Sequence, residues 1–197
     1  DLFNCYFSGR TQSVKNNQSN SSFCSINLGV PQGSILGPLF FSIFINDLPF
    51  FIKLHCKLFA DDTTLYKIFE NKNKPLSNTI TEFKHELSPM LKWCLMNRLD
   101  INWTKTFIMF VSGNRKVKAP LSIDIENNVV SVVNEFKLLG IVIDNTLNFQ
   151  KHISYTIKKV NPKLYSIKKL FHLPLSVRIQ FFKTFILPHF DNCLSLL

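Results

Sequence analysis

Two adjacent aspartates, Asp61 and Asp62, interrupt a β-prone stretch and restrict how that stretch folds. The residues Leu54 to Ala60 before them and Thr63 to Ile68 after them have the composition of strands. Neighbouring carboxylates repel each other and lose hydration at the edge of a core, so the pattern predicts a β-hairpin that turns at the acidic pair. A turn holds both carboxylates near one point, where a cation would neutralise them. A solvated turn with a purely structural role also fits these two residues taken alone.

A cluster of helix and strand breakers precedes this hairpin. Its members fall within ten residues and are Gly29, Pro31, Gly33, Gly37 and Pro38. The strongly apolar run Leu39 to Ile45 follows, with apolar side chains at helical spacing. We expect a buried helix here that continues to about Leu48 and ends at Asp47-Leu48-Pro49.

The remaining pattern predicts an α+β fold, in which mixed helices and strands are followed by a helical tail. We expect Leu2 to Tyr6 and Phe23 to Leu28 to pair as strands across a loop at Asn16 to Ser22. A helix is expected over Ser77 to Leu99, with a kink or a second helix start at Pro89. The other predicted elements are a strand at Phe107 to Val111, a hairpin of Leu121 to Ile125 with Val129 to Val133, a strand at Phe136 to Ile143, and helices from Phe149 onward with breaks near Pro174 and Pro188.

Positive charge is concentrated in the second half of the chain. The net charge is +10, and residues 101–197 carry thirteen basic and five acidic side chains. Between Lys151 and Lys183 there are eight basic residues and no acidic one. A segment of one sign attracts a polyanion, so we favour contact with a nucleic-acid backbone over a solvated helix face. The charge pattern does not distinguish DNA from RNA.

The spacing of cysteines, histidines and apolar residues argues against a disulfide scaffold, a histidine metal site and a membrane-spanning segment. The five cysteines are widely spaced and odd in number, which argues against a disulfide scaffold and for a reducing compartment. The histidines at 152, 172 and 189 lack the spacing of metal ligands. The longest apolar run, Ile35 to Ile45, is too short for a bilayer that needs about 20 residues, so no membrane partner is expected.

Several blocks of sequence, taken in order, resemble the reverse transcriptases of non-LTR (LINE-type) retrotransposons. They are distributed over most of the chain and are Gly29 to Phe40 (GVPQGSILGPLF) with Ile45 to Pro49, Phe59 to Asp62 (FADD), Leu99 to Thr106 (LDINWTKT), Phe136 to Asp144 (FKLLGIVID) and Ile186 to Asp191 (ILPHFD). The ordered set is far more specific than any one block.

The resemblance implies a partial right-hand polymerase. The expected parts are the end of a fingers or palm insertion in residues 1–28, a palm of antiparallel sheet with packed helices in 29–147, and a small basic helical thumb in 148–197. The implied activity is RNA-directed DNA synthesis by two-metal nucleotidyl transfer from a dNTP to a primer 3′-hydroxyl. The implied partners are an RNA template, a DNA primer and a dNTP, and the family is expected in cytoplasm and nucleus.

Site residues follow from the same resemblance. Asp61 and Asp62 would be catalytic carboxylates that bind Mg²⁺, with Mn²⁺ as a possible substitute, and Lys105 would act near the nucleotide phosphates. The alternatives are a surface lysine at 105 and a simple turn at Gly33. Further implied sites are substrate contacts at Gln32, Gly33 and Ser34, a primer grip at Phe136, Leu139 and Gly140 (a buried strand otherwise), and nucleic-acid backbone contacts at Lys151, Lys158, Lys159, Lys163, Lys168 and Lys169.

One part of the family pattern is not found. The palm should contain a third aspartate on a strand before Gly29, and Asp1, the only acidic residue there, has unrelated surroundings. We therefore expect the N-terminal half of a longer parent protein to be missing and the isolated chain to be inactive. Two alternatives remain open: a non-catalytic nucleic-acid-binding remnant of a decayed element, and an interaction domain with a structural Asp-Asp turn.

Overall fold

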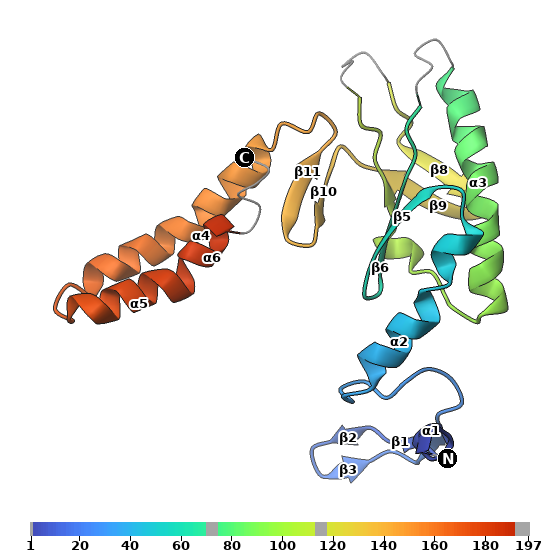
Figure 1. The fold of residues 1–197 in the computed structure, drawn as a ribbon, viewed down its shortest axis with the longest axis horizontal. Helices are drawn as coiled ribbons and strands as arrows, with labels where there is room; N and C mark the ends of the chain where they lie inside the picture. The colour runs from blue at the N-terminus through green and yellow to red at the C-terminus, as the bar shows by residue number, and fades with distance from the viewer. Residues whose placement is uncertain (1, 70–74, 113–117, 192–197) are drawn as a thin grey trace. The chain divides into compact units, whose positions relative to one another are not determined.

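A computed structural model describes residues 2–69, 75–112 and 118–191 (Figure 1). The chain forms two compact units, Asp1–Ile101 and Asn102–Leu197, and each is described by itself. We call them the first and the second unit.

The first unit begins with helix α1 (Leu2–Phe7), so the strand expected at Leu2 to Tyr6 is wrong. The aromatic rings of Phe3, Tyr6 and Phe7 contact the ring of Phe40 at centroid distances of 5.6, 5.4 and 4.9 Å. Their spacing of three and four residues places them on one side of a helix, whereas a strand would divide them between two faces. This packing against one partner explains why the segment is helical.

Short antiparallel pairs follow α1. Strand β1 (Thr11–Gln12) pairs with β4 (Cys24–Ser25), and β2 (Lys15–Asn16) pairs with β3 (Ser19–Asn20). The segment expected as a loop, Asn16 to Ser22, therefore contributes to a small hairpin. The partner of the later strand is β1 instead of the expected Leu2 to Tyr6.

Helix α2 (Gly37–Ile45) confirms the helix expected after the breaker cluster, but that helix is only partly buried. A separate 3-10 turn, η1 (Leu48–Phe51), begins after it and contains Pro49. Leu39 and Ile43 are exposed, and the buried side chains are those of Ile45 and Leu48. The apolar composition predicted burial, whereas only part of the helix surface meets a partner: Phe40 packs on α1, and Ile45 belongs to the core.

The hairpin expected around the acidic pair is confirmed. Strand β5 (His55–Phe59) pairs antiparallel with β6 (Asp62–Tyr66). Helix α3 (Leu76–Met96) continues through Pro89, so no second helix begins there. The core beneath this hairpin is formed by Ile45, Leu48, Trp93 and Cys94, with Phe41, Ile52, Leu58, Met90, Leu99 and Ile101 packed around them.

The second unit contains two small sheets. A 3-10 turn η2 (Trp103–Lys105) leads to β7 (Phe107–Ile108), which is shorter than the strand expected to reach Val111. Strands β8 (Ser122–Ile125) and β9 (Asn128–Val132) form the expected hairpin, and β7 pairs with β9 in parallel. Ile123, Ile125 and Val130 are its buried side chains.

The single strand expected at Phe136 to Ile143 is wrong. The segment forms a hairpin of β10 (Glu135–Leu138) and β11 (Ile141–Asp144). Its two turn residues, Leu139 and Gly140, have φ values of 47° and 95°. Positive φ at both central residues is the geometry of the tight turns that suit the twist of a hairpin.

The described part of the second unit ends with helices α4 (Gln150–Lys169), α5 (Leu175–Phe185) and α6 (Leu187–Asp191). The break near Pro174 is confirmed, because Pro174 directly precedes α5. The second break falls at Ile186, close to the expected Pro188, which lies inside α6. Helices α4 and α5 lie side by side (Figure 1). Of the helices described, none has the length and hydropathy that crossing a membrane requires.

The fold class is therefore mixed, with helices and small, mostly antiparallel sheets. The described strands form five separate small sheets, and not one continuous sheet.

Candidate active site

The acidic turn connects β5 to β6 and lies at an exposed corner of the first unit. Phe59 and Asp62 are paired across the strands, so Ala60 and Asp61 are the two turn residues. Ala60 has a φ of 51°, which a tight hairpin turn requires at this position. Both aspartates are exposed, and Asp62 is the first residue of β6.

Strand alternation explains how the hairpin is held. Leu58 is half-buried and packs against the core, whereas its neighbour Phe59 is exposed. Residues paired across an antiparallel ladder share a face, so Asp62 lies with Phe59 on the face opposite the core contact of Leu58. The core therefore fixes the strands and leaves the acidic turn open to solvent.

The two carboxylates have no protein partner within the described ranges 2–69, 75–112 and 118–191. Neither makes a hydrogen bond or an ion pair, and no cluster of three or more His, Cys, Asp or Glu side chains forms there. One or two carboxylates, with water and phosphate oxygens, are the ligand set that Mg²⁺ usually takes in proteins. Asp61 and Asp62 therefore fit as part of a divalent cation site, without completing one.

Gln32, Gly33 and Ser34 lie within the breaker segment and differ in their contacts. Gln32 and Gly33 are exposed, and Gly33 has a φ of 82°. The hydroxyl of Ser34 donates to the carbonyl of Pro31 at 2.8 Å and accepts from the amide of Gly37 at 3.1 Å. The Tyr6 hydroxyl donates to Ser34 Oγ at 2.7 Å. Ser34 thus ties α1 to the start of α2, while Gln32 and Gly33 are the residues free to meet a ligand.

Lys105 lies in the second unit, at the end of η2. Its backbone amide bonds the side-chain oxygen of Asn102 at 3.2 Å, which fixes the turn. The side chain of Lys105 is exposed and has no partner among the residues that the structure describes.

The residues implied as a primer grip all belong to the β10–β11 hairpin. Phe136 is half-buried on β10, and Leu139 and Gly140 form the turn at its end. Leu139 is exposed at the tip. Beside this hairpin, Lys137 donates to the hydroxyl of Tyr155 on α4 at 2.8 Å.

The basic side chains of α4 differ in their partners. Lys151 forms an ion pair with Glu135, and Lys159 and Lys169 lie over the rings of Tyr155 and Tyr165 at 4.7 and 5.1 Å. Lys158 and Lys168 have no partner in the described part of the chain.

Lys163 is held inside the helical layer of the second unit. Its ammonium donates to the carbonyl of Phe185 at 3.0 Å and lies 2.5 Å from Nε2 of His189. Burial and the positive charges of Lys163 and Lys159 lower the pKa of His189.

Sequence reasoning missed two features that the structure brings together. Hydrogen bonds from Lys137 and Lys159 lower the pKa of the Tyr155 hydroxyl. Only the packing of the β10–β11 hairpin against α4 reveals this contact. Asp144 is buried, and its carboxylate accepts hydrogen bonds from the turn that leads into α4. The sequence signal for this turn is an aspartate two residues before Thr146, because an aspartate side chain in an Asx turn accepts a hydrogen bond from the backbone two residues on.

A family comparison identifies the protein class. The model of the family described as reverse transcriptase (RNA-dependent DNA polymerase) matches residues 2–143. The chain belongs to the reverse transcriptase family. The matched region contains the acidic turn, the breaker cluster, Lys105 and the β10–β11 hairpin up to Ile143.

Similar proteins point to the same group of reverse transcriptases. The chain is 26% identical over 198 residues to a probable RNA-directed DNA polymerase from transposon X-element of Drosophila melanogaster, covering 95% of this chain and 21% of that protein. It is also 26% identical over 202 residues to an RNA-directed DNA polymerase from mobile element jockey of Drosophila funebris, with the same shares covered. The expected relationship to non-LTR reverse transcriptases is confirmed. The chain spans about a fifth of the length of these relatives. No solved structure matches it significantly.

Proposed function

We propose that this reverse transcriptase chain supplies part of the active site for RNA-directed DNA synthesis. The observation that carries the proposal is the pair Asp61 and Asp62, unpartnered in the described residues and exposed at the β5–β6 turn, inside the family-matched region. Two adjacent uncompensated carboxylates at a tight turn are suited to binding a cation.

In this proposal Asp61 and Asp62 hold divalent metal, with Mg²⁺ as the expected ion and Mn²⁺ as a substitute. The bound ions would supply charge stabilisation for nucleotidyl transfer from a dNTP to a primer 3′-hydroxyl. The two aspartates contribute oxygen ligands at a position that the core contact of Leu58 keeps fixed. This preorganisation means that little rearrangement is needed when the substrate binds.

The other sites are assigned to the polymer substrates. Gln32 and Gly33 would contact template and incoming nucleotide, with Ser34 holding their turn in place. Lys105 would act on the nucleotide phosphates, and Phe136, Leu139 and Gly140 would contact the primer. The lysines of α4 would follow the nucleic-acid backbone. Residues 1–28, 29–147 and 148–197 would then correspond to a fingers or palm insertion, a palm and a thumb.

The isolated chain is proposed to be inactive. No third acidic side chain joins Asp61 and Asp62 in the ranges that the structure describes. The resemblance calls for a third palm carboxylate, which we assign to the N-terminal part of a longer parent protein. Removing one ligand from a site that acts through charge costs orders of magnitude in rate.

Primer extension tests this function with the longer protein encoded by the surrounding reading frame. An RNA template, a DNA primer and dNTPs are supplied with Mg²⁺, and Asp61→Asn and Asp62→Asn are compared with the wild type. Asp124→Asn is the matched control, because Asp124 is exposed on β8 and outside the proposed site. We expect loss of synthesis in the first two variants only. Undiminished synthesis by Asp61→Asn refutes the proposed role.

A second candidate function is nucleic-acid binding without catalysis. The absence of a third acid near Asp61 and Asp62 within the described residues favours it, together with the basic side chains of α4. It predicts that even the longer protein binds template and primer in a salt-dependent way and makes no DNA. Metal-dependent synthesis by the longer protein excludes this alternative.

A further inference from the structure

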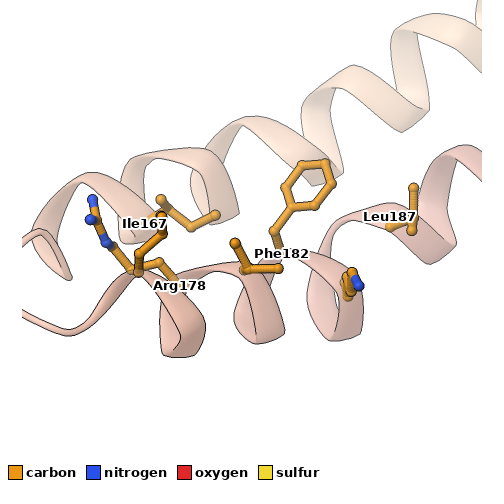
Figure 2. A pocket seen from close by; sticks show the side chains of 7 residues that line it. Ile167, Arg178, Phe182 and Leu187 are labelled. Carbon is orange, nitrogen blue, oxygen red and sulfur yellow. The ribbon is translucent and has the colours of Figure 1, made fainter.

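An apolar groove runs along the helical layer of the second unit. It has a volume of about 340 Å³, and Ile167 of α4, Leu175, Ile179 and Phe182 of α5, and Leu187 of α6 form its apolar lining. Figure 2 shows the side chains of Ile167 and Phe182 in the space between the helices, with Arg178 beside Ile167.

The lining residues of α5 form a continuous stripe. Leu175, Ile179 and Phe182 are spaced by four and three residues, which places them on one side of the helix. All three remain exposed, and 45% of the surface of Ile179 is accessible. A helix buries its apolar stripe against another element. Helices α4 and α6 flank this stripe and leave its side chains largely accessible, so the described residues cover it only in part.

The groove also contains a cation without a counter-charge. Arg178 follows Leu175 by three residues, and its Nε is buried and has no hydrogen-bond partner in the described part of the chain. Lys183 adds a second positive charge to the lining. No acidic residue occurs between Phe149 and Phe190. A buried donor without an acceptor is destabilising, so an occupant that supplies a carboxylate gains affinity here.

We propose that this groove receives an acidic amphipathic helix from the same protein, outside the 197 residues. Its apolar side would cover Ile179 and Phe182, and a carboxylate would accept hydrogen bonds from the guanidinium of Arg178. We assign the helix to the same protein because the chain spans only 21% of the length of these two relatives. A segment of the same polypeptide docks at a high effective concentration, which a separate partner lacks.

This inference goes beyond the proposed polymerase function and does not depend on it. The groove is lined by helices α4, α5 and α6 of the second unit, and the acidic turn belongs to the first unit.

Overlapping synthetic peptides provide the test. Peptides of about 25 residues, long enough to form helices, cover the reading frame outside the 197 codons, and binding to the 197-residue chain is measured by fluorescence anisotropy. We expect one peptide with an acidic residue within an apolar stripe to bind. Arg178→Glu should weaken its binding at least tenfold, and replacing the peptide's carboxylate by lysine should restore binding to that variant. Lys168→Glu, on α4 outside the lining, is the charge control and should change binding less than twofold.

Ile179→Ser serves as a second variant in case Arg178→Glu fails to fold, since Ile179 is half-exposed. It should also weaken binding at least tenfold. The proposal is overturned if no peptide binds, if the binding peptide lacks an acidic residue, or if both groove variants bind normally. Self-association of the chain that Ile179→Ser abolishes would assign the groove to a second copy and overturn it too. Asp61→Asn should bind the peptide normally, which separates this result from failure of the polymerase proposal.

Discussion

The carboxylate of Asp144 accepts hydrogen bonds from both the backbone amide and the hydroxyl of Thr146, at 2.9 and 2.5 Å. The amides of Asn148 and Phe149 also donate to it, at 3.4 and 3.2 Å. One buried side chain at the end of β11 therefore organises the turn that leads into α4. The hydrogen bonds, with that of the Thr146 hydroxyl as the largest cause, lower the pKa of Asp144 below its ordinary value of 3.8.

Replacing Asp144 by asparagine should lower the melting temperature at neutral pH by several degrees, because an amide accepts these hydrogen bonds less strongly. The lowered pKa means that the stabilisation is complete above the unfolded-state pKa and is lost as the pH falls through the folded-state pKa. Thermal melts from pH 7 down to pH 2 should therefore converge for variant and wild type. Asp124→Asn, at an exposed position without these bonds, is the control. A constant difference at all pH values would contradict the assignment.

Lys67 should contribute to stability through two glutamates of α3. Its ammonium lies 2.5 Å from a carboxylate oxygen of Glu82 and 2.6 Å from one of Glu86, and 21% of its side chain is exposed. Lys67→Met should destabilise the first unit by about 1 kcal/mol, because both carboxylates then lose their contact with the Lys67 ammonium. Urea denaturation measures this, with Lys57→Met on the exposed face of β5 as control.

The same site predicts a pH dependence at high pH. Hydrogen bonds to Glu82 and Glu86 raise the pKa of Lys67 above its usual 10.5. The stabilisation is present below that value and decreases as the pH rises through the higher folded-state pKa. If Lys67→Met lowers the free energy of unfolding by the same amount at pH 7 and in strong alkali, the ion pairs are not the cause.

Gly37 should resist substitution although it lies in a helix. A Cβ at this position would approach the hydroxyl of Ser34 to 2.8 Å and the carbonyl oxygen of Pro31 to 3.2 Å. Alanine favours a helix by about 1 kcal/mol over glycine, but Ser34 would have to give up its contacts to admit it. We expect Gly37→Ala to destabilise the chain by about 1–2 kcal/mol in urea melts. Ser42→Ala, at an exposed position of the same helix, should be neutral, and a more stable Gly37→Ala would disprove the steric argument.

Leu139→Asn should stabilise the β10–β11 hairpin. Leu139 has a φ of 47° at a turn position where asparagine is tolerated much better, and 48% of its surface is exposed. The expected gain is about 0.5 kcal/mol, measured as a higher denaturation midpoint. Leu121→Asn replaces an even more exposed leucine, 90% accessible and without positive φ, and should give no such gain. If the two variants behave alike, the gain does not come from the turn.

Salt dependence of nucleic-acid binding should distinguish the lysines of α4. Lys158 and Lys168 lack protein partners in the described residues, so Lys158→Gln and Lys168→Gln should each reduce the slope of log affinity against log salt by about one. Lys163 is occupied by the carbonyl of Phe185 and by His189, and Lys163→Gln should change the slope much less. Filter binding with a template–primer duplex at several salt concentrations measures the slopes. Equal effects of all three variants would contradict this distinction.

The local sequence pattern was sufficient to predict those elements that are stabilised by residues close in sequence. The hairpin at Asp61 and Asp62, the helix after Gly37 and the hairpin of β8 and β9 were predictable, because turn residues and alternation specify them locally. The family was also predictable, since ordered motifs depend only on the sequence. Prediction failed for Leu2–Phe7, whose helix packs its aromatic side chains on Phe40, and for Phe136 to Ile143, where a turn with leucine at positive φ divides one apolar run into two strands.

The sequence by itself therefore determined the family, the acidic turn and the excess of positive charge, because each is written in residue types and their spacing. The tertiary structure decided which polar groups are already satisfied. It shows that Ser34 is held by Tyr6 and Gly37, that Lys163 bonds Phe185, and that Arg178 has a buried nitrogen without an acceptor among the described residues. The physical reason is that hydrogen bonds and burial depend on distances between segments far apart in the chain, and residue spacing does not specify those distances.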